Sequence, residues 1–128
     1  MNEKNKLVYP ELSYKICGFL FYIHNQLGRF RKEKDYADAL EIVFKENKTP
    51  YSRETRTDNS LLSQRFGLYK LDFLIDNKVI LELKAKTLLT KEDYYQLKRY
   101  LESKKLKLGL LVNFRDKYLK PKRVINHL

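Results

Sequence analysis

The chain lacks the features that mark secreted and membrane-spanning proteins. Its 128 residues include one cysteine, Cys17, so neither an intrachain disulfide nor a cysteine-based zinc site is possible, which agrees with a reducing compartment. The longest unbroken apolar run, residues 16–23, is about half of what a bilayer span needs, and no small-residue cleavage site follows it. No internal repeat, linker or low-complexity segment is visible. These absences favour one cytoplasmic domain over residues 1–128.

Acidic residues are scarce relative to basic ones. The 16 Asp and Glu are outnumbered by 27 Lys and Arg, which leaves a net charge of +11. A strongly basic small protein accumulates near polyanions, because each phosphate that it neutralises releases condensed counterions. The charge therefore indicates nucleic acid as a partner. A merely soluble lysine-rich surface and an acidic protein partner remain as alternatives.

Apolar residues recur at helical spacing near the N-terminus. Pro10 suits the first turn of a helix, and Gly28 ends it. The apolar stripe comprises Leu12, Ile16, Leu20, Ile23 and Leu27. Further aromatic residues lie off that stripe, so we expect this helix either between two layers or at a subunit interface. Cys17 lies within it and is expected to be a core thiol rather than a nucleophile.

The rest of the chain predicts an α/β domain. A second helix follows the basic turn "RFRKEK", and a third, capped by Thr90, runs through "KEDYYQLKRYLESKK". Strands are expected at Tyr51–Thr57, 66–75, 79–86 and 108–114, with a loop at 58–64 and a basic tail of unassigned structure. The order α-α-β-β-β-α-β predicts a central mixed sheet flanked by helices, with the last strand brought in beside the interior of the sheet.

Charged residues interrupt the two strongest predicted strands, in "LDFLIDNKVILELKAK". Side chains alternate between the faces of a strand, so Glu82 and Lys84 point the same way. If residues 76–78 form a three-residue turn, Asp72 falls directly opposite Glu82 on that face. A two-residue turn would separate the two acids.

Opposed carboxylates in a sheet repel each other, and burying them is costly unless something compensates. A divalent cation such as Mg²⁺ or Mn²⁺ does so, because hard cations prefer carboxylate oxygens together with water and phosphate. Lys84 would then orient the attacking water or stabilise developing negative charge. The alternative is a solvated sheet face on which Glu82 and Lys84 form an ordinary ion pair.

The spacing of Asp72, Glu82 and Lys84 resembles the D…ExK signature of the PD-(D/E)XK nuclease superfamily. Over nearly its whole length the chain is similar to the bacterial GxxExxY proteins of that superfamily, through "IHNQLG", "EKDYADAL", "YSRE", "LDFLIDNKVILELKA", "LTKEDYYQLKRYL" and "LGLLVNF". Glu33 and Tyr36 match the glutamate and tyrosine of the naming motif, whereas Phe30 replaces its glycine.

The resemblance implies a restriction-endonuclease-like core and further site residues. Glu33 would complete the metal site, the carbonyl of Leu83 would be a ligand, and Gln96 with Tyr100 resembles the QxxxY element of the exonuclease branch. The expected function is hydrolysis of phosphodiester bonds in DNA, with Mg²⁺ or Mn²⁺ held by Asp72, Glu82, Leu83 and Glu33. Lys91, Lys98, Arg99 and Tyr100 would bind the nucleic acid. The alternative is an inactive protein of the same fold, either a nucleic-acid-binding protein or an accessory protein that dimerises through the first helix.

Overall fold

The structure is a computed structural model that describes residues 8–57 and 69–127, with the backbone only for residues 55–57 and 69–72. Its helices are α1 (Pro10–Leu27), α2 (Glu33–Glu46) and α4 (Lys91–Lys104). Its strands are β1 (Tyr51–Thr57), β2 (Tyr69–Ile75), β3 (Val79–Lys84), β4 (Leu108–Asn113) and β5 (Lys122–Ile125). They form one sheet in the order β1-β2-β3-β4-β5, in which β3 and β4 are parallel and the other neighbours antiparallel. The predicted α/β fold with a mixed sheet is confirmed.

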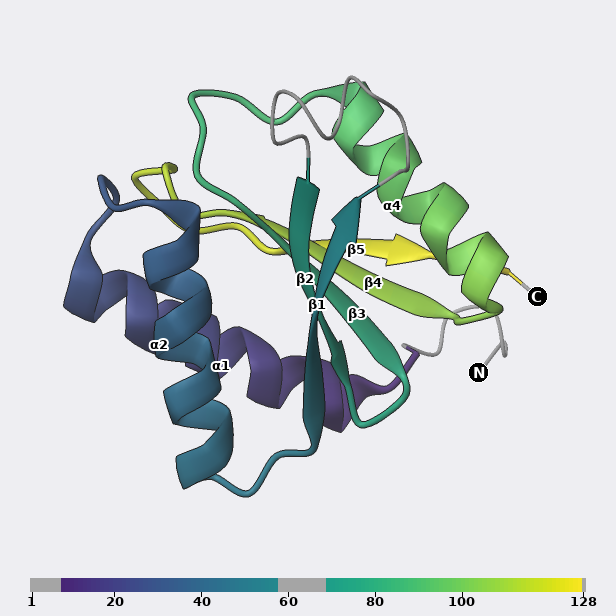
Figure 1. The fold of residues 1–128 in the computed structure, drawn as a ribbon, viewed down its shortest axis with the longest axis horizontal. Coiled ribbons are helices and arrows are strands. Elements are labelled where there is room, and N and C mark those ends of the chain that lie inside the picture. Colours follow the sequence, from purple (N-terminus) through teal and green to yellow (C-terminus); the bar gives the residue numbers. More distant parts are fainter. Residues whose placement is uncertain (1–7, 58–68, 128) are drawn as a thin grey trace, which may run out of the picture.

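Helices cover both faces of the sheet, with α1 and α2 on one and α4 on the other (Figure 1). The faces alternate along β3, because Leu81 and Leu83 belong to the core under α1 and α2, whereas Ile80 packs with α4. Glu82 and Lys84 share the parity of Ile80. They therefore lie on the face that α4 covers.

Helix α1 follows its predicted bounds. It ends at Gly28, which takes a φ of 78° and donates its N–H to the carbonyl of His24 at 2.9 Å. Exposed aromatic side chains line its outer surface, at Tyr14, Phe21 and Tyr22. The expectation that this helix lies between two layers of the domain is therefore wrong, whereas its role in a dimer stays a prediction.

Helix α4 is fixed by its cap and by one tight contact. The Thr90 hydroxyl accepts from the Asp93 N–H at 3.2 Å, which confirms the predicted cap. On the buried side, Leu97 packs so closely on Gly109 of β4 that a Cβ at that glycine would lie 2.9 Å from a Leu97 methyl. The helix is thereby packed closely on β4 at the position opposite Ile80 of β3.

Two strand ends differ from the prediction, and one further strand was not predicted. Strand β3 ends at Lys84 rather than residue 86, and β4 ends at Asn113 rather than 114. A fifth strand, β5, pairs with β4, although the basic tail showed no alternation that would predict it. The predicted loop at 58–64 and the start of the strand at 66–68 lie outside the described residues. No helix in the described part of the chain combines the length and apolarity that crossing a membrane requires.

Candidate nuclease site

The hairpin of β2 and β3 has the register that the metal hypothesis requires. Its turn spans three residues, 76–78, of which Asp76 and Asn77 adopt positive φ values of 52° and 55°. Asp and Asn tolerate this left-handed backbone better than most residues. The odd number of turn residues places Asp72 directly opposite Glu82. The prediction that depended on turn length is confirmed, although the side chain of Asp72 lies outside the described part of the structure.

Glu82 is fully buried and forms an ion pair with Lys84, whose side chain is slightly exposed. The Nζ of Lys84 lies 3.9 Å from Oε1 of Glu82, and the lysine side chain is 13% exposed. A solvated sheet face would leave both groups in water, so that alternative is wrong. Because desolvating a carboxylate is expensive, its position under α4 points to a function that needs a charge there.

A third acid, Glu54, extends this row. Glu54 on β1 lies opposite Asp72, which in turn lies opposite Glu82. Directly opposed residues share a face, so Glu54 and Glu82 lie on the same side of the sheet. The hydroxyl of Tyr100 on α4 donates to Oε2 of Glu54 at 2.8 Å. We call Glu54, Asp72 and Glu82 the acidic row, which crosses three neighbouring strands.

The second lysine of "ELKAK" is engaged elsewhere. Lys86 bonds Asp93 at the start of α4, with 2.5 Å between Nζ and Oδ2. Burial of Asp93 tends to raise its pKa, but hydrogen bonds from Lys86 and Thr90 outweigh that effect and hold the pKa below its ordinary value. The side chain of Asn113 bonds both the N–H and the carbonyl of Lys86, at 3.0 and 2.7 Å, which ends the ladder of β3 after Lys84. Lys84 is thus the lysine that faces the acidic row.

The first turn of α2, which begins with Glu33, adjoins the same end of the sheet. The Tyr36 ring stacks on Phe114 with centroids 4.1 Å apart, and the Phe114 N–H donates to the carbonyl of Lys84 at 2.9 Å. The Tyr36 hydroxyl donates to the carbonyl of Gly28 at 2.6 Å. The tyrosine of the naming motif is therefore a structural brace that fixes how α2 begins. Glu33 is half-buried there.

The other predicted site residues are spread along α4 and β3. Gln96 lies one helical turn before Tyr100 and is half-buried. Lys91 is exposed, whereas Arg99 pairs with Glu92 at 2.6 Å on the helix surface. The remaining two are Lys98, which is half-buried, and Leu83, whose side chain lies in the core under α1 and α2.

A family model of the PD-(D/E)XK nuclease superfamily matches residues 10–125. The chain belongs to the PD-(D/E)XK nuclease superfamily. No curated protein and no solved structure matches it. Family membership agrees with the mixed sheet between helices, and it suggests nuclease activity. The closer likeness to the GxxExxY proteins stays a prediction.

The donor chemistry of this PD-(D/E)XK protein fits Mg²⁺ or Mn²⁺. Carboxylate oxygens are the ligands that these hard cations prefer, and the acidic row supplies them on one face. Among the side chains that the structure describes, which do not include Asp72, no three His, Cys, Asp or Glu groups gather closely enough to hold an ion.

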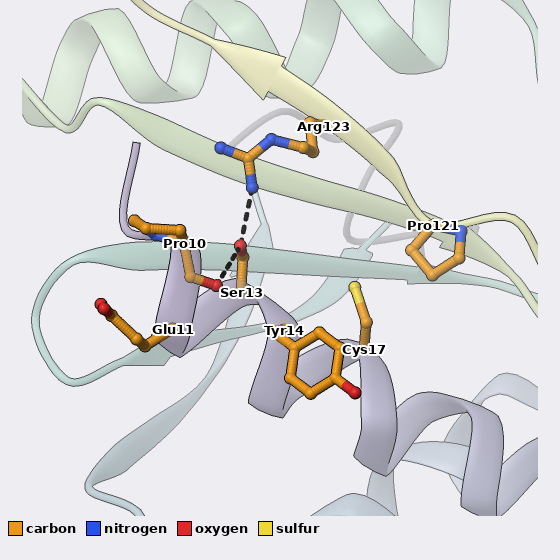
Figure 2. Close-up of a pocket in the computed structure, with 7 residues that line it drawn as sticks. All are labelled: Pro10, Glu11, Ser13, Tyr14, Cys17, Pro121 and Arg123. Atoms are coloured by element: carbon orange, nitrogen blue, oxygen red, sulfur yellow. Dashed lines mark hydrogen bonds between the residues drawn. The ribbon is translucent and has the colours of Figure 1, made fainter. Parts of the chain in front are cut away.

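A separate cavity of about 590 Å³ lies between the start of α1 and β5 of this PD-(D/E)XK protein (Figure 2). Arg123 crosses it and donates to Oγ of Ser13 at 2.7 Å and to the carbonyl of Val8 at 2.8 Å. Cys17 lines this cavity rather than the centre of the core, and burial raises the pKa of its thiol. A raised pKa keeps the thiol protonated, which agrees with the expectation that it is no nucleophile.

Two contributors to the site had escaped sequence reasoning. Glu54 was visible only within "YSRE", because the 11 residues between β1 and β2 do not fix how these strands pair. From the sequence, Asn113 was interpreted as one more residue of a buried strand. Its signal was a lone amide at the end of an apolar run, directly beside the predicted catalytic lysine in the parallel pair of β3 and β4.

Proposed function

We propose that this protein is a metal-dependent nuclease that hydrolyses phosphodiester bonds in DNA. The observation that carries the proposal is the register that sets Asp72 opposite Glu82, together with the burial of Glu82 next to Lys84. Apolar residues would pack under α4 at far lower cost than a carboxylate, so a buried acid at this position calls for a functional reason.

Asp72 and Glu82 would hold the cation, with Glu33 and the carbonyl of Leu83 as further ligands. When bound, Mg²⁺ or Mn²⁺ neutralises phosphate charge and lowers the pKa of water. Lys84 faces Glu82 from the more exposed side, where it can orient a water or donate to a phosphate oxygen. Tyr100 keeps Glu54 in place at the outer end of the acidic row.

The basic residues of α4 would guide the DNA backbone. Lys91 and Lys98, seven residues apart, present positive charge along one flank of this helix. Gln96 shares the opposite flank with Tyr100, four residues further along. Arg99 contributes less, because its exposed pairing with Glu92 partly cancels its charge. The net charge of +11 would add a salt-dependent attraction for any polyanion.

Cleavage assays on single- and double-stranded DNA test this function. The wild type is expected to cleave with Mg²⁺ or Mn²⁺ and to be inactive with EDTA. Lys84→Met and Asp72→Asn should each lose about 100-fold or more in rate, because the first removes the lysine that would act on the phosphate and the second a ligand of the cation. Lys45→Met, which changes an exposed lysine at the end of α2, should remain active.

DNA binding without metal is measured in parallel. Salt-sensitive binding with no cleavage by the wild type under either metal would contradict the enzyme and favour the inactive binding protein. Absence of any salt-dependent affinity for DNA would instead favour an acidic protein partner.

A further inference from the structure

An exposed aromatic ring stands in the turn between α1 and α2. Phe30 is 75% exposed, although the turn around it is rigid. The Tyr36 hydroxyl braces this turn by donating to the carbonyl of Gly28 at 2.6 Å and accepting from the Arg31 N–H at 3.2 Å. These hydrogen bonds fix the backbone around Phe30, so its side chain stays exposed to solvent.

Two arginines bind each other's backbone next to this ring. Arg29 Nε donates to the carbonyl of Arg115 at 2.8 Å, and Arg115 Nε donates to the carbonyl of Arg29 at 3.0 Å. Their guanidinium carbons lie 4.9 and 5.6 Å from the centroid of Phe30. Because three quarters of Phe30 remains exposed, the two guanidinium groups cover only a minor part of its ring.

No ion pair joins Arg29 or Arg115 to a carboxylate anywhere in residues 8–54 and 73–127. Holding two guanidinium groups together without an anion is unfavourable, and a bound phosphate would remove that cost. The two arginines therefore favour an anionic ligand, and the exposed ring of Phe30 favours an aromatic one.

A second exposed ring extends the surface. Tyr118, in the loop between β4 and β5, is 71% exposed, with Nζ of Lys117 5.5 Å from its centroid. That loop is anchored to α1 by a 2.8 Å hydrogen bond between Nε2 of His24 and the carbonyl of Asp116. The aromatic–basic surface comprises Arg29, Phe30, Arg115, Lys117 and Tyr118.

This surface adjoins the proposed catalytic lysine. Arg115 Nη2 donates to the carbonyl of Ala85 at 3.4 Å, and Ala85 directly follows Lys84. The aromatic–basic surface therefore lies at the end of β3, one residue beyond Lys84, although the Lys84 side chain itself lies on the face that α4 covers.

We propose that the aromatic–basic surface stacks unpaired bases, so that the substrate is single-stranded or has a single-stranded segment beside the scissile phosphate. Bases in a duplex are stacked on one another and cannot reach an external ring, whereas unpaired bases stack on aromatic side chains and on arginine. This inference rests on the proposed nuclease function for its placement, but base stacking requires no catalysis. It can therefore be tested separately.

Binding is measured in EDTA by fluorescence anisotropy, with labelled single-stranded DNA, single-stranded RNA and the matching DNA duplex. Phe30→Ala and Phe30→Leu should each weaken single-strand binding about 10-fold, the loss expected for one stacked base, and leave duplex binding within about 2-fold. Tyr14→Ala is the matched control, because it removes a similarly exposed ring beside the cavity of Figure 2. A single-strand preference with either DNA or RNA supports the proposal.

Spectroscopy adds a readout that lost charge or altered folding would not give. The chain has no tryptophan, so Phe30→Trp carries the only indole. Single-stranded oligonucleotides should quench the fluorescence of this indole strongly, and the duplex should not. An abasic site is moved one position at a time along the single-stranded oligonucleotide. At the position whose base stacks on Phe30, it should lower the affinity of the wild type about 10-fold, and it should not change the affinity of Phe30→Ala.

Equal losses of single-strand and duplex binding in Phe30→Ala would overturn the proposal, as would equal quenching by both. A loss in Tyr14→Ala as large as that in Phe30→Ala would do the same. Stacking without cleavage in any metal would instead leave this surface intact and refute only the nuclease.

Discussion

Single side chains distinguish the proposed site from an ordinary sheet face. Asp72 and Glu82 could be placed opposite each other from the sequence, because a three-residue turn leaves one register for the hairpin. The burial of Glu82 followed from the need to cover Leu74 and Ile80 on the same face. Glu54 could not be placed, since strand pairing across a long connection depends on tertiary packing rather than on turn geometry.

Tyr100→Phe tests whether the outer end of the acidic row belongs to the site. The change removes the hydroxyl that donates to Glu54, so that carboxylate loses an orienting hydrogen bond. We expect Mn²⁺ affinity, measured by isothermal titration calorimetry, to fall about 10-fold, as is typical when a residue that orients metal ligands is lost. Tyr95→Phe, on the exposed side of the same helix, should bind Mn²⁺ normally. Unchanged affinity in Tyr100→Phe would exclude this role.

Elements with local end signals were the easiest to predict. Helix α4 has a cap and a first-turn acid in its sequence, and its bounds were found. Strand β5 is short, basic and preceded by Pro121, so nothing local marks it, and it forms because β4 offers an open edge. Strand β3 is shorter than predicted because the Asn113 side chain, rather than a neighbouring strand, bonds the backbone of Lys86.

Asp93→Ala tests what holds the start of α4. At pH 7 this variant should be about 1–2 kcal/mol less stable in urea unfolding, because it loses its bonds to Thr90 and Lys86. The folded state holds the pKa of Asp93 below its ordinary value of about 3.9. Its stabilising contribution is therefore complete above that value and is lost as the pH falls through the lower, folded pKa.

The difference between wild type and Asp93→Ala should accordingly shrink below about pH 4. Glu92→Gln is the control, because its exposed pair with Arg99 should change stability by less than about 0.5 kcal/mol at any pH. A gap of the same size at pH 7 and pH 3 would show that the charge of Asp93 contributes nothing.

In the whole molecule, the net charge determines the attraction of polyanions, whereas the fold determines which substrate is selected. The net charge of +11 was visible in the composition and attracts any polyanion, but it does not select a substrate. Selection depends on surfaces that only the folded chain assembles. Arg29 and Arg115 are 86 positions apart and meet because β4 returns to the turn between α1 and α2.

The metal site that we propose would be built on strands rather than on loops. Strands β1, β2 and β3 each contribute one acid to the row, and α4 lies on the face of the sheet that Glu54 and Ile80 share (Figure 1). Sites built on strands and helices hold their ligands more firmly than sites on loops. The order of the elements up to β4 could be predicted from hydrophobic periodicity, whereas the place of Glu54 in the row and the close packing of α4 on Gly109 had no sequence signal.

A crystal structure of the protein soaked with Mn²⁺ tests the central claim most directly. We expect one anomalous peak that lies about 2.1 Å from a carboxylate oxygen of Asp72 and from one of Glu82. This peak should be absent from Glu82→Gln crystals soaked in the same way. Density that shows both carboxylates without a shared ion at millimolar Mn²⁺, or an ion bound elsewhere, would contradict it.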